Sequence, residues 1–411
     1  IDITEAVVFG KNNNLTVKAE HPSFIADLPW VCGGCSGEWG FSEGSQPMGI
    51  FRPVSLIITN NLRVEPFGVH IWNDKYTSKE RATLQVATTI KNYGKLSKKV
   101  TVFTSVLDAI GKEVSSSTLL AQCNFGETKE VTQTLPGIIK PKLWSPKNPY
   151  LYQVVTTLYE EGKKIDQVTT PYGIRWISWP INREGNDTQF YVNDEPFFIN
   201  GTCEYEHLIG NSHSFSSQQI KSRIAQIKGA GFNAFREAHQ PHNLRYQNEL
   251  DKEGILFWSQ FSAHIWYDTP EFKENFKTLL KEWIKERRNS PSVVLWGLQN
   301  ESTIPKDFAA ECTQIIREMD PSSANQRLVT TCNGGEGTDW NVVQNWSGTY
   351  GGDPYNYDVE LSRQLLNGEY GAWRSADLHS EGEFDPKGIW SENRFSQLIE
   401  IKVREAESVK D

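Results

Sequence analysis

The residues that decide the fold are Val293-Val294-Leu295-Trp296-Gly297-Leu298-Gln299-Asn300-Glu301, an apolar run that ends on a glutamate. A second run of this kind, Leu365-Leu366-Asn367-Gly368-Glu369, lies further along the chain. Both have the length of a buried strand. In a (β/α)₈ barrel, side chains at the C-terminal ends of the strands line the active-site mouth. The sequence therefore predicts that Glu301 and Glu369 face each other at the mouth of such a barrel.

Residues 178–411 alternate between strand-like and helical segments, a pattern typical of a parallel sheet. The expected helices include 217–229 and 271–288, with a last amphipathic helix at 391–409. Seven strands are expected, at 197–200, 232–236, 255–261, 293–300, 327–332, 342–346 and 364–368.

No eighth strand is visible after the seventh, and a seven-stranded barrel leaves two backbone edges unpaired. We therefore interpret the chain as a fragment whose TIM barrel lacks its last strand. The structure should have a gap between the first and seventh strands, an eighth strand from another segment, or disorder near 375–411.

Residues 67–177 have no helical period and read as alternating strands. The runs 82–90 and 99–107 are typical of half-buried strands joined by a turn at Asn92-Tyr93-Gly94. Their number and spacing predict an immunoglobulin-like β-sandwich. Residues 1–66 are also strand-like and rich in turns, for example at 15–19 and 54–58.

Two carboxylates at a barrel mouth are the machinery of glycoside hydrolysis, in which one acts as acid and then base and the other as nucleophile. The alternative is a chance pair of strand-terminal glutamates. The neighbouring residues favour the catalytic interpretation. Asn300-Glu301 after Val-Val-Leu-Trp, and Glu369-Tyr370-Gly371-Ala372, resemble the acid/base and nucleophile motifs of glycoside hydrolase family 2. That family contains β-galactosidases, β-glucuronidases and β-mannosidases.

The resemblance extends to the domains before the barrel. Leu143-Trp144-Ser145-Pro146-Lys147-Asn148-Pro149-Tyr150-Leu151-Tyr152 resembles a family segment that packs the sandwich on the barrel. Gly49-Ile50-Phe51-Arg52-Pro53-Val54 resembles a segment late in the family's N-terminal jelly-roll domain. The resemblance implies three domains: the end of a sugar-binding-like jelly roll at 1–66, the sandwich at 67–177 and the catalytic barrel at 178–411.

The resemblance also implies roles for single residues. Glu301 would be the acid/base, Glu369 the nucleophile, and Asn300 would bond the 2-hydroxyl of the sugar. The stretch from Asn233 to Pro241 is similar to the family motif N-x-x-R-x-S-H-x-P. It implies that Arg236 keeps the nucleophile ionised and that His239 donates to a substrate hydroxyl.

Further candidates for contact with the sugar lie in three other segments. Glu206 and His207 partly match a polar motif that follows the first strand, and Trp346 and Tyr350 match aromatic positions after the sixth. Trp373 is a candidate for stacking on a sugar ring. Ordinary packing is the alternative for Trp346 and Tyr350.

We expect no metal and no other cofactor. Magnesium-dependent family members carry a Glu-x-His pair after the third strand, where this chain has Ser262-Ala263-His264. The carboxylate oxygen that Mg²⁺ prefers is therefore missing. Cys32-Gly-Gly-Cys35 is one isolated pair, which favours a local disulfide or two free thiols over zinc. Cys203 and Cys332 are expected to be buried apolar residues in barrel strands.

Composition excludes some partners. The net charge of −9 argues against nucleic acid, and no apolar stretch reaches the 18 residues of a membrane span. The chain begins at Ile1, so targeting is not readable, and a periplasmic or secreted bacterial location and a homo-oligomeric state are left open. The expected partner is a glycoside or oligosaccharide substrate.

The sequence as a whole predicts a retaining exo-β-glycosidase. β-Galactosidase is favoured over β-glucuronidase and β-mannosidase, because Gly201-Thr202-Cys203 looks most like the entry segment of β-galactosidases. The Asn-x-Lys motif of the family's glucuronidases is also not visible. One alternative is a non-hydrolytic carbohydrate-binding protein on the same scaffold. A purely structural sandwich module is an interpretation for residues 1–177 alone.

Overall fold

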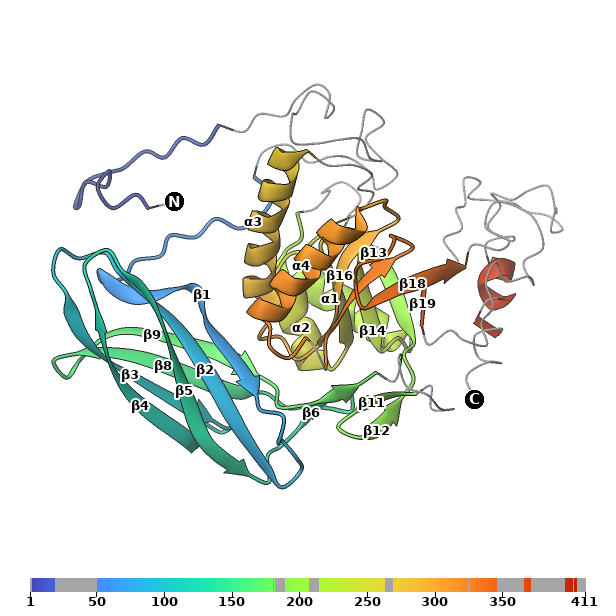
Figure 1. Cartoon of the computed structure of the whole chain (residues 1–411), viewed down its shortest axis with the longest axis horizontal. Coiled ribbons are helices and arrows are strands. Elements are labelled where there is room, and N and C mark those ends of the chain that lie inside the picture. The colour runs from blue at the N-terminus through green and yellow to red at the C-terminus, as the bar shows by residue number, and fades with distance from the viewer. Residues whose placement is uncertain are drawn as a thin grey trace.

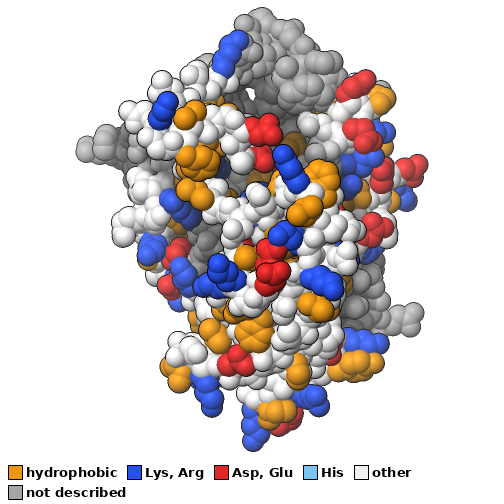
Figure 2. Space-filling model, turned by 90° about the vertical axis from the view of Figure 1, so that its left-hand side faces the viewer, with side chains coloured by type: hydrophobic (Ala, Val, Ile, Leu, Met, Phe, Trp, Pro, Cys, Tyr) orange, Lys and Arg blue, Asp and Glu red, His pale blue; other side chains and the backbone are white. Residues whose placement is uncertain are grey.

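The computed structural model describes residues 2–18, 50–179, 181, 189–206, 214–262, 269–323, 326–345, 366–370, 396–401 and 403–404. Figure 1 shows two bodies side by side, an antiparallel β-sandwich and a parallel sheet with helices packed against it. None of the helices in this described part of the chain has the length and apolarity that a membrane span requires. On the face drawn in Figure 2, basic and acidic side chains are interspersed rather than segregated.

The sandwich consists of two antiparallel sheets, which confirms the predicted architecture. One sheet has the order β1-β2-β5 and the other the order β4-β3-β8-β9. Inward-facing residues such as Leu84, Val100 and Leu158 are fully buried between them. The strands are β1 (Leu62–Asn73), β2 (Arg81–Asn92), β3 (Lys98–Leu107), β4 (Glu113–Cys123), β5 (Thr128–Ile139), β8 (Tyr152–Glu160) and β9 (Lys163–Tyr172).

No strand forms in the described residues before β1, contrary to the strand-like reading of 15–19 and 54–58. Leu56 is 70% exposed and Ile58 83% exposed. A strand needs a neighbour for its backbone hydrogen bonds and an apolar layer for its side chains. The described residues supply neither at this point, so local β-propensity alone does not form a sheet.

The segment around Trp144 joins the sandwich to the barrel, as its sequence predicted. Trp144 is fully buried and its Nε1 donates to the carbonyl of Asp251 at 2.8 Å. It lies in the core that also contains Leu256 and Val294 of the barrel. Two short strands, β6 (Trp144–Ser145) and β7 (Asn148–Pro149), pair around this contact.

A small antiparallel sheet leads into the barrel and corrects one predicted strand. It contains β10 (Ile177–Ser178), β11 (Phe190–Val192) and β12 (Glu195–Phe197). Asn193 and Asp194 between the last two strands both have positive φ, as a tight hairpin turn requires. The apolar run expected as the first barrel strand at 197–200 therefore belongs partly to this hairpin. The first barrel strand starts at Gly201.

The barrel is a parallel sheet in the sequential order β13 to β19, nearly closed but with β13 and β19 as its edges. No pairing joins these two edges within the described residues, so the predicted seven strands with an open seam are confirmed. The strands are β13 (Gly201–Tyr205), β14 (Ala234–Ala238), β15 (Leu256–Gln260), β16 (Val293–Asn300), β17 (Leu328–Cys332), β18 (Trp340–Asn345) and β19 (Asn367–Tyr370).

Helices pack outside this sheet (Figure 1). Ser216 caps the first one with a reciprocal bond to Gln219, and its Ile220, Ile224 and Ile227 face the core at helical spacing. The helices are α1 (Ser217–Gly229), α2 (Arg245–Glu253), α3 (Pro270–Arg287) and α4 (Lys306–Met319). The backbone is also helical at 396–401 and 403–404, within the predicted last helix, while 371–395 lie outside the described residues.

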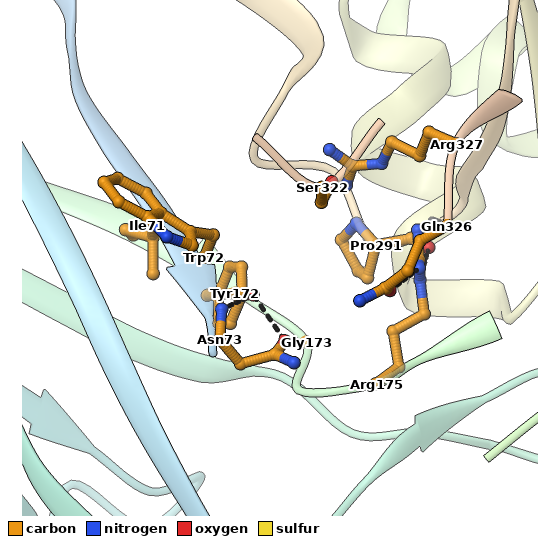
Figure 3. A pocket seen from close by; sticks show the side chains of 10 residues that line it. All are labelled: Ile71, Trp72, Asn73, Tyr172, Gly173, Arg175, Pro291, Ser322, Gln326 and Arg327. Atoms are coloured by element: carbon orange, nitrogen blue, oxygen red, sulfur yellow. Dashed lines mark hydrogen bonds between the residues drawn. The ribbon is translucent and has the colours of Figure 1, made fainter. Parts of the chain in front are cut away.

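Two buried arginines bind the chain that enters β16 (Figure 3): Arg175 from the segment that follows the sandwich, and Arg327 from just before β17. Arg175 donates to the carbonyls of Pro291 and Val293 at 2.7 Å each. Arg327 donates to the carbonyls of Val293 and Ser290 at 3.0 and 2.8 Å. These bonds fix the N-terminal end of β16, so the strand presents its opposite end, Asn300, to the barrel mouth.

The same interface buries a histidine that should make stability depend on pH. His70 is 4% exposed, and burial lowers its pKa from 6.5 to about 3, with Arg288 and Arg327 acting in the same direction and Asp320 against it. The folded state therefore keeps His70 neutral, while the unfolded chain binds a proton below pH 6.5. The stability contributed by this difference is present above pH 6.5 and is lost as the pH falls from 6.5 toward 3.

Replacing His70 with glutamine removes this titration. Between pH 7.5 and 4.5, the wild type should lose about 2 to 3 kcal/mol more unfolding free energy than His70→Gln. Urea unfolding of both proteins at each pH measures the difference. If the unfolding free energies of the wild type and His70→Gln change equally with pH, His70 is not held neutral in the folded protein.

Candidate active site

The centre of the site is an ion pair between two strands that lie far apart in the sheet. Arg236 of β14 donates its Nη1 to the carboxylate of Glu369 in β19 and to the carbonyl of Gly368 at 3.2 Å. Arg236 and Glu369 are 4% and 7% exposed. Side chains alternate along a strand, and Phe235 packs in the helix-facing layer with Tyr246 and Phe257, so Arg236 faces the barrel interior.

Close packing fixes the strand that carries Glu369. A Cβ atom at Gly368 would lie 2.5 Å from Cys332 Sγ and 3.1 Å from Trp258 Cη2. Only glycine allows β19 to approach this closely. Trp258 also lies under the guanidinium of Arg236, 4.5 Å from ring centroid to Cζ. The close packing of Gly368 in the barrel interior and the ion pair with Arg236 therefore fix the position of the Glu369 carboxylate.

Asn300 at the end of β16 is oriented by two donors. Its Oδ1 accepts from Arg236 Nη2 at 2.7 Å and from Gln344 Nε2 at 3.3 Å. Its Nδ2 is buried and has no hydrogen-bond partner in the described part of the chain. Because both acceptor bonds fix the amide, this N–H₂ group is left as a donor for a bound molecule.

Glu301 follows Asn300 directly, at the point where the chain leaves the strand. Its φ of 45° lies in the left-handed region, which is uncommon outside glycine, and its N–H donates to the carbonyl of Cys332 at 2.9 Å. Burial raises the pKa of the Cys332 thiol to about 12, and the charges of Glu369 and Glu301 act in the same direction. The bond from Glu301 N–H to Cys332 joins the end of β16 to the end of β17.

His239, immediately after β14, contacts the same carboxylate. Its Nε2 lies 3.6 Å from Glu369 Oε1, and its Nδ1 lies 3.4 Å from Gln260 Oε1 at the end of β15. The ring of Tyr205 meets the imidazole edge-on, with centroids 5.4 Å apart. The structure thus brings together Arg236, His239, Asn300 and Glu369 of the predicted set, with Glu301 next to them.

Cys203 differs from the buried residue expected from the sequence. It is exposed because β13 is an edge of the sheet. Its Sγ nevertheless lies 3.7 Å from Arg236 Nη1, and one atom each of Cys203, His239 and Glu369 lie within 4.8 Å of one another. The positive charge of Arg236, which lies beside Cys203 and pairs with Glu369, disfavours a cation among these three residues.

Glu206 lies in a different environment from the sugar contact expected of it. It is fully buried, one carboxylate oxygen pairs with Arg52, and the other accepts from the backbone N–H of Asn243 at 3.0 Å. These contacts favour a structural role, in which the segment before the sandwich is tied to a loop at the barrel mouth. The other predicted or discussed positions, His207, His264, Trp346, Tyr350, Trp373, Cys32 and Cys35, lie outside the described residues.

Two glutamines of the site were not among the predicted residues. Gln260 ends β15 and is fully buried, and Gln344 in β18 is 6% exposed. Their signal is position, because a buried polar side chain near the C-terminal end of a barrel strand faces the mouth.

Two segments of the chain match family models. Residues 67–175 match the model described as glycosyl hydrolases family 2, and residues 184–352 match that of the family 2 TIM barrel domain. A β-glucuronidase of Bacteroides fragilis is 26% identical over 88% of this chain and 52% of its own length. A β-galactosidase of Bacteroides ovatus is 30% identical over 62% of this chain and 30% of its own length.

Solved structures show the same fold. A β-glucuronidase of Bacteroides uniformis superposes with a TM-score of 0.72 at 22% identity, covering 84% of this chain and 45% of that protein. The chain spans about half or less of the length of these relatives.

Proposed function

The chain belongs to family 2 of the glycosyl hydrolases, and from this premise we propose that its site hydrolyses a terminal β-linked sugar with retention of configuration. The observation that carries the proposal is the connected set Glu369–Arg236–Asn300, with Glu301 as the next residue. In this set, the carboxylate of Glu369 is held by the buried Arg236, and the carboxylate of Glu301 follows the end of β16. The Nδ2 donor of Asn300 has no partner in the described part of the chain.

In the first step, Glu301 donates its proton to the glycosidic oxygen as the bond from that oxygen to the anomeric carbon breaks. Glu369 attacks the anomeric carbon, and the leaving alcohol departs with the proton. In the second step, Glu301 takes a proton from water, the water oxygen bonds to the anomeric carbon, and Glu369 is released. This mechanism requires the two carboxylates to lie about 5 Å apart when substrate is bound.

The neighbouring residues support these roles through charge and hydrogen bonding. Arg236 keeps Glu369 ionised, as a nucleophile must be before it attacks. The free N–H₂ of Asn300 donates to the hydroxyl next to the anomeric carbon, a contact that strengthens as positive charge develops on the sugar. His239 Nε2, beside Glu369, is placed to contact a further hydroxyl.

The sugar we propose is β-galactose, on the entry segment Gly201-Thr202-Cys203. A β-glucuronide is the second candidate, because relatives named β-glucuronidase match over most of this chain. A uronate needs a cationic partner. The described cation of the site, Arg236, is already paired with Glu369.

One panel of nitrophenyl glycosides tests the proposal. We expect hydrolysis of the β-galactoside, with the β-anomer as the first product in a proton NMR time course. Faster hydrolysis of the β-glucuronide would select the second candidate. Release of the α-anomer first would exclude retention, and sugar binding without hydrolysis of any glycoside would favour the non-hydrolytic alternative.

A further inference from the structure

A buried carboxylate outside the catalytic set holds two loops at the barrel mouth. Glu237 follows Arg236 in β14, faces the helix side of the sheet and is 1% exposed. Its nearest described cation is Arg287, whose Nη2 lies 3.9 Å from Oε1, beyond hydrogen-bond distance. The carboxylate is therefore held mainly by hydrogen bonds.

Those hydrogen bonds come from the two segments that follow β14 and β15. Glu237 Oε1 accepts from the backbone N–H of His242 at 2.9 Å. Oε2 accepts from the backbone N–H of Gln260 and the hydroxyl of Ser259, each at 2.8 Å. Arg287 adds a bond to the carbonyl of His242 at 3.1 Å. One carboxylate thus ties the loop 239–243 to the end of β15.

Both tied segments carry residues of the candidate active site. The loop begins with His239, and the end of β15 is Gln260, whose Oε1 faces His239 Nδ1. The opposite ring nitrogen of His239 faces Glu369. A shift of either backbone would change the distance between His239 and Gln260, and with it the direction in which Nε2 points.

We infer that Glu237 is a positioning residue for the proposed glycosidase site: it acts through His239 and Gln260 to set the imidazole beside Glu369. This inference rests on the proposed function. Burial raises the pKa of Glu237 to about 7, while Arg287 and the three hydrogen bonds lower it. The cost of burying the acid is therefore only partly offset, which is the pattern of a group retained for geometry.

The test uses a substitution of the same shape. Glu237→Gln keeps the volume but has one acceptor oxygen in place of two. Whichever way the amide lies, its N–H₂ group faces the backbone N–H of either His242 or Gln260, and one tie is lost. We expect kcat/KM for the best glycoside to fall by about 10- to 100-fold, because small displacements of catalytic groups have large effects on rate.

A matched control separates positioning from general damage. Asp251 is another buried carboxylate, 4% exposed, but it accepts from Ser290 and Ser292 at the opposite end of the barrel. Asp251→Asn should leave kcat/KM within about 2-fold of wild type at a temperature where both variants are folded. An equal loss of activity in both variants would overturn the inference.

A double-mutant cycle with His239→Ala gives the decisive readout. If Glu237 acts through His239, adding Glu237→Gln to His239→Ala should change kcat/KM by less than about 2-fold. If Glu237→Gln lowers kcat/KM by the same factor in the His239→Ala background as in the wild type, the inference is overturned. If the wild type hydrolyses no glycoside, the proposed function fails, and the ¹⁵N shifts of the His239 ring then decide. If the ¹⁵N shifts of the His239 ring differ between Glu237→Gln and the wild type, the positioning role is supported. If these shifts are unchanged, the inference is overturned.

Discussion

Replacing Glu369 with glutamine should lower kcat for nitrophenyl glycosides by at least about 10³-fold, because an amide oxygen cannot form the covalent intermediate. The variant keeps the shape of the side chain and an acceptor for Arg236, so substrate affinity should change much less. Steady-state kinetics on the sugar that the wild type prefers measure both. A matched control is Glu204→Gln on β13, whose carboxylate pairs with Arg223 at 3.1 Å, and which should stay within about 2-fold of wild type.

Covalent labelling tests the same assignment independently. A 2-deoxy-2-fluoro glycoside slows the second step, so the sugar accumulates on the nucleophile. Mass spectrometry of the digested protein should find it on Glu369. Label on any other residue would show that the nucleophile has been misassigned, even if Glu369→Gln is inactive.

Replacing Glu301 with alanine should harm poor leaving groups far more than good ones. An unactivated alkyl glycoside needs its oxygen protonated, whereas a dinitrophenyl glycoside departs without help. We expect kcat/KM to fall by about 10³-fold or more for the first substrate and by about 10-fold or less for the second. A Brønsted plot over a series of phenol leaving groups measures this difference as a steeper slope.

Azide supplies the second criterion for Glu301. With an activated substrate the sugar reaches Glu369, and removal of the general base then limits the second step. The small anion fits the space left by the side chain and attacks without a base, so added azide should restore turnover and give a glycosyl azide. Equal losses on good and poor leaving groups, without azide rescue, would mean that Glu301 is not the proton donor.

The alternation of strands and helices and the two sheets of the sandwich were predictable, because burial imposes periods of 2.0 and 3.6 on the sequence. α1 was placed correctly at 217–229, since its capping box and isoleucine spacing are local signals. The first barrel strand was misplaced at 197–200. The apolar run there also suits a barrel strand, but the turn at Asn193-Asp194 makes its first residue, Phe197, pair with β11 instead. Competition between a hairpin and a parallel strand is a tertiary effect that local pattern does not contain.

In the candidate site, too, some residues were predictable from local motifs, whereas their contacts depend on distant parts of the chain. Arg236, Asn300 and Glu369 could be named from motifs, but the bonds that unite them join residues up to 133 positions apart. Glu237 fills a position that the motif leaves open, and two of its three hydrogen-bond donors are backbone N–H groups, which have no side-chain signature. For Glu206, the motif identified a polar residue near the mouth, but its partner Arg52 lies 154 positions earlier in the chain.

The bond between Arg236 and Glu369 links the second and seventh strands of an open sheet, so the proposed nucleophile also holds the sheet together. Catalytic side chains commonly trade stability for activity, and their loss often makes a protein more robust. Here the guanidinium of Arg236 is buried. A residue at position 369 that accepts no hydrogen bond would leave this positive charge unpaired inside the barrel. Loss of an acceptor at position 369 therefore costs folding free energy, and selection for a folded chain alone would preserve a hydrogen-bond acceptor there.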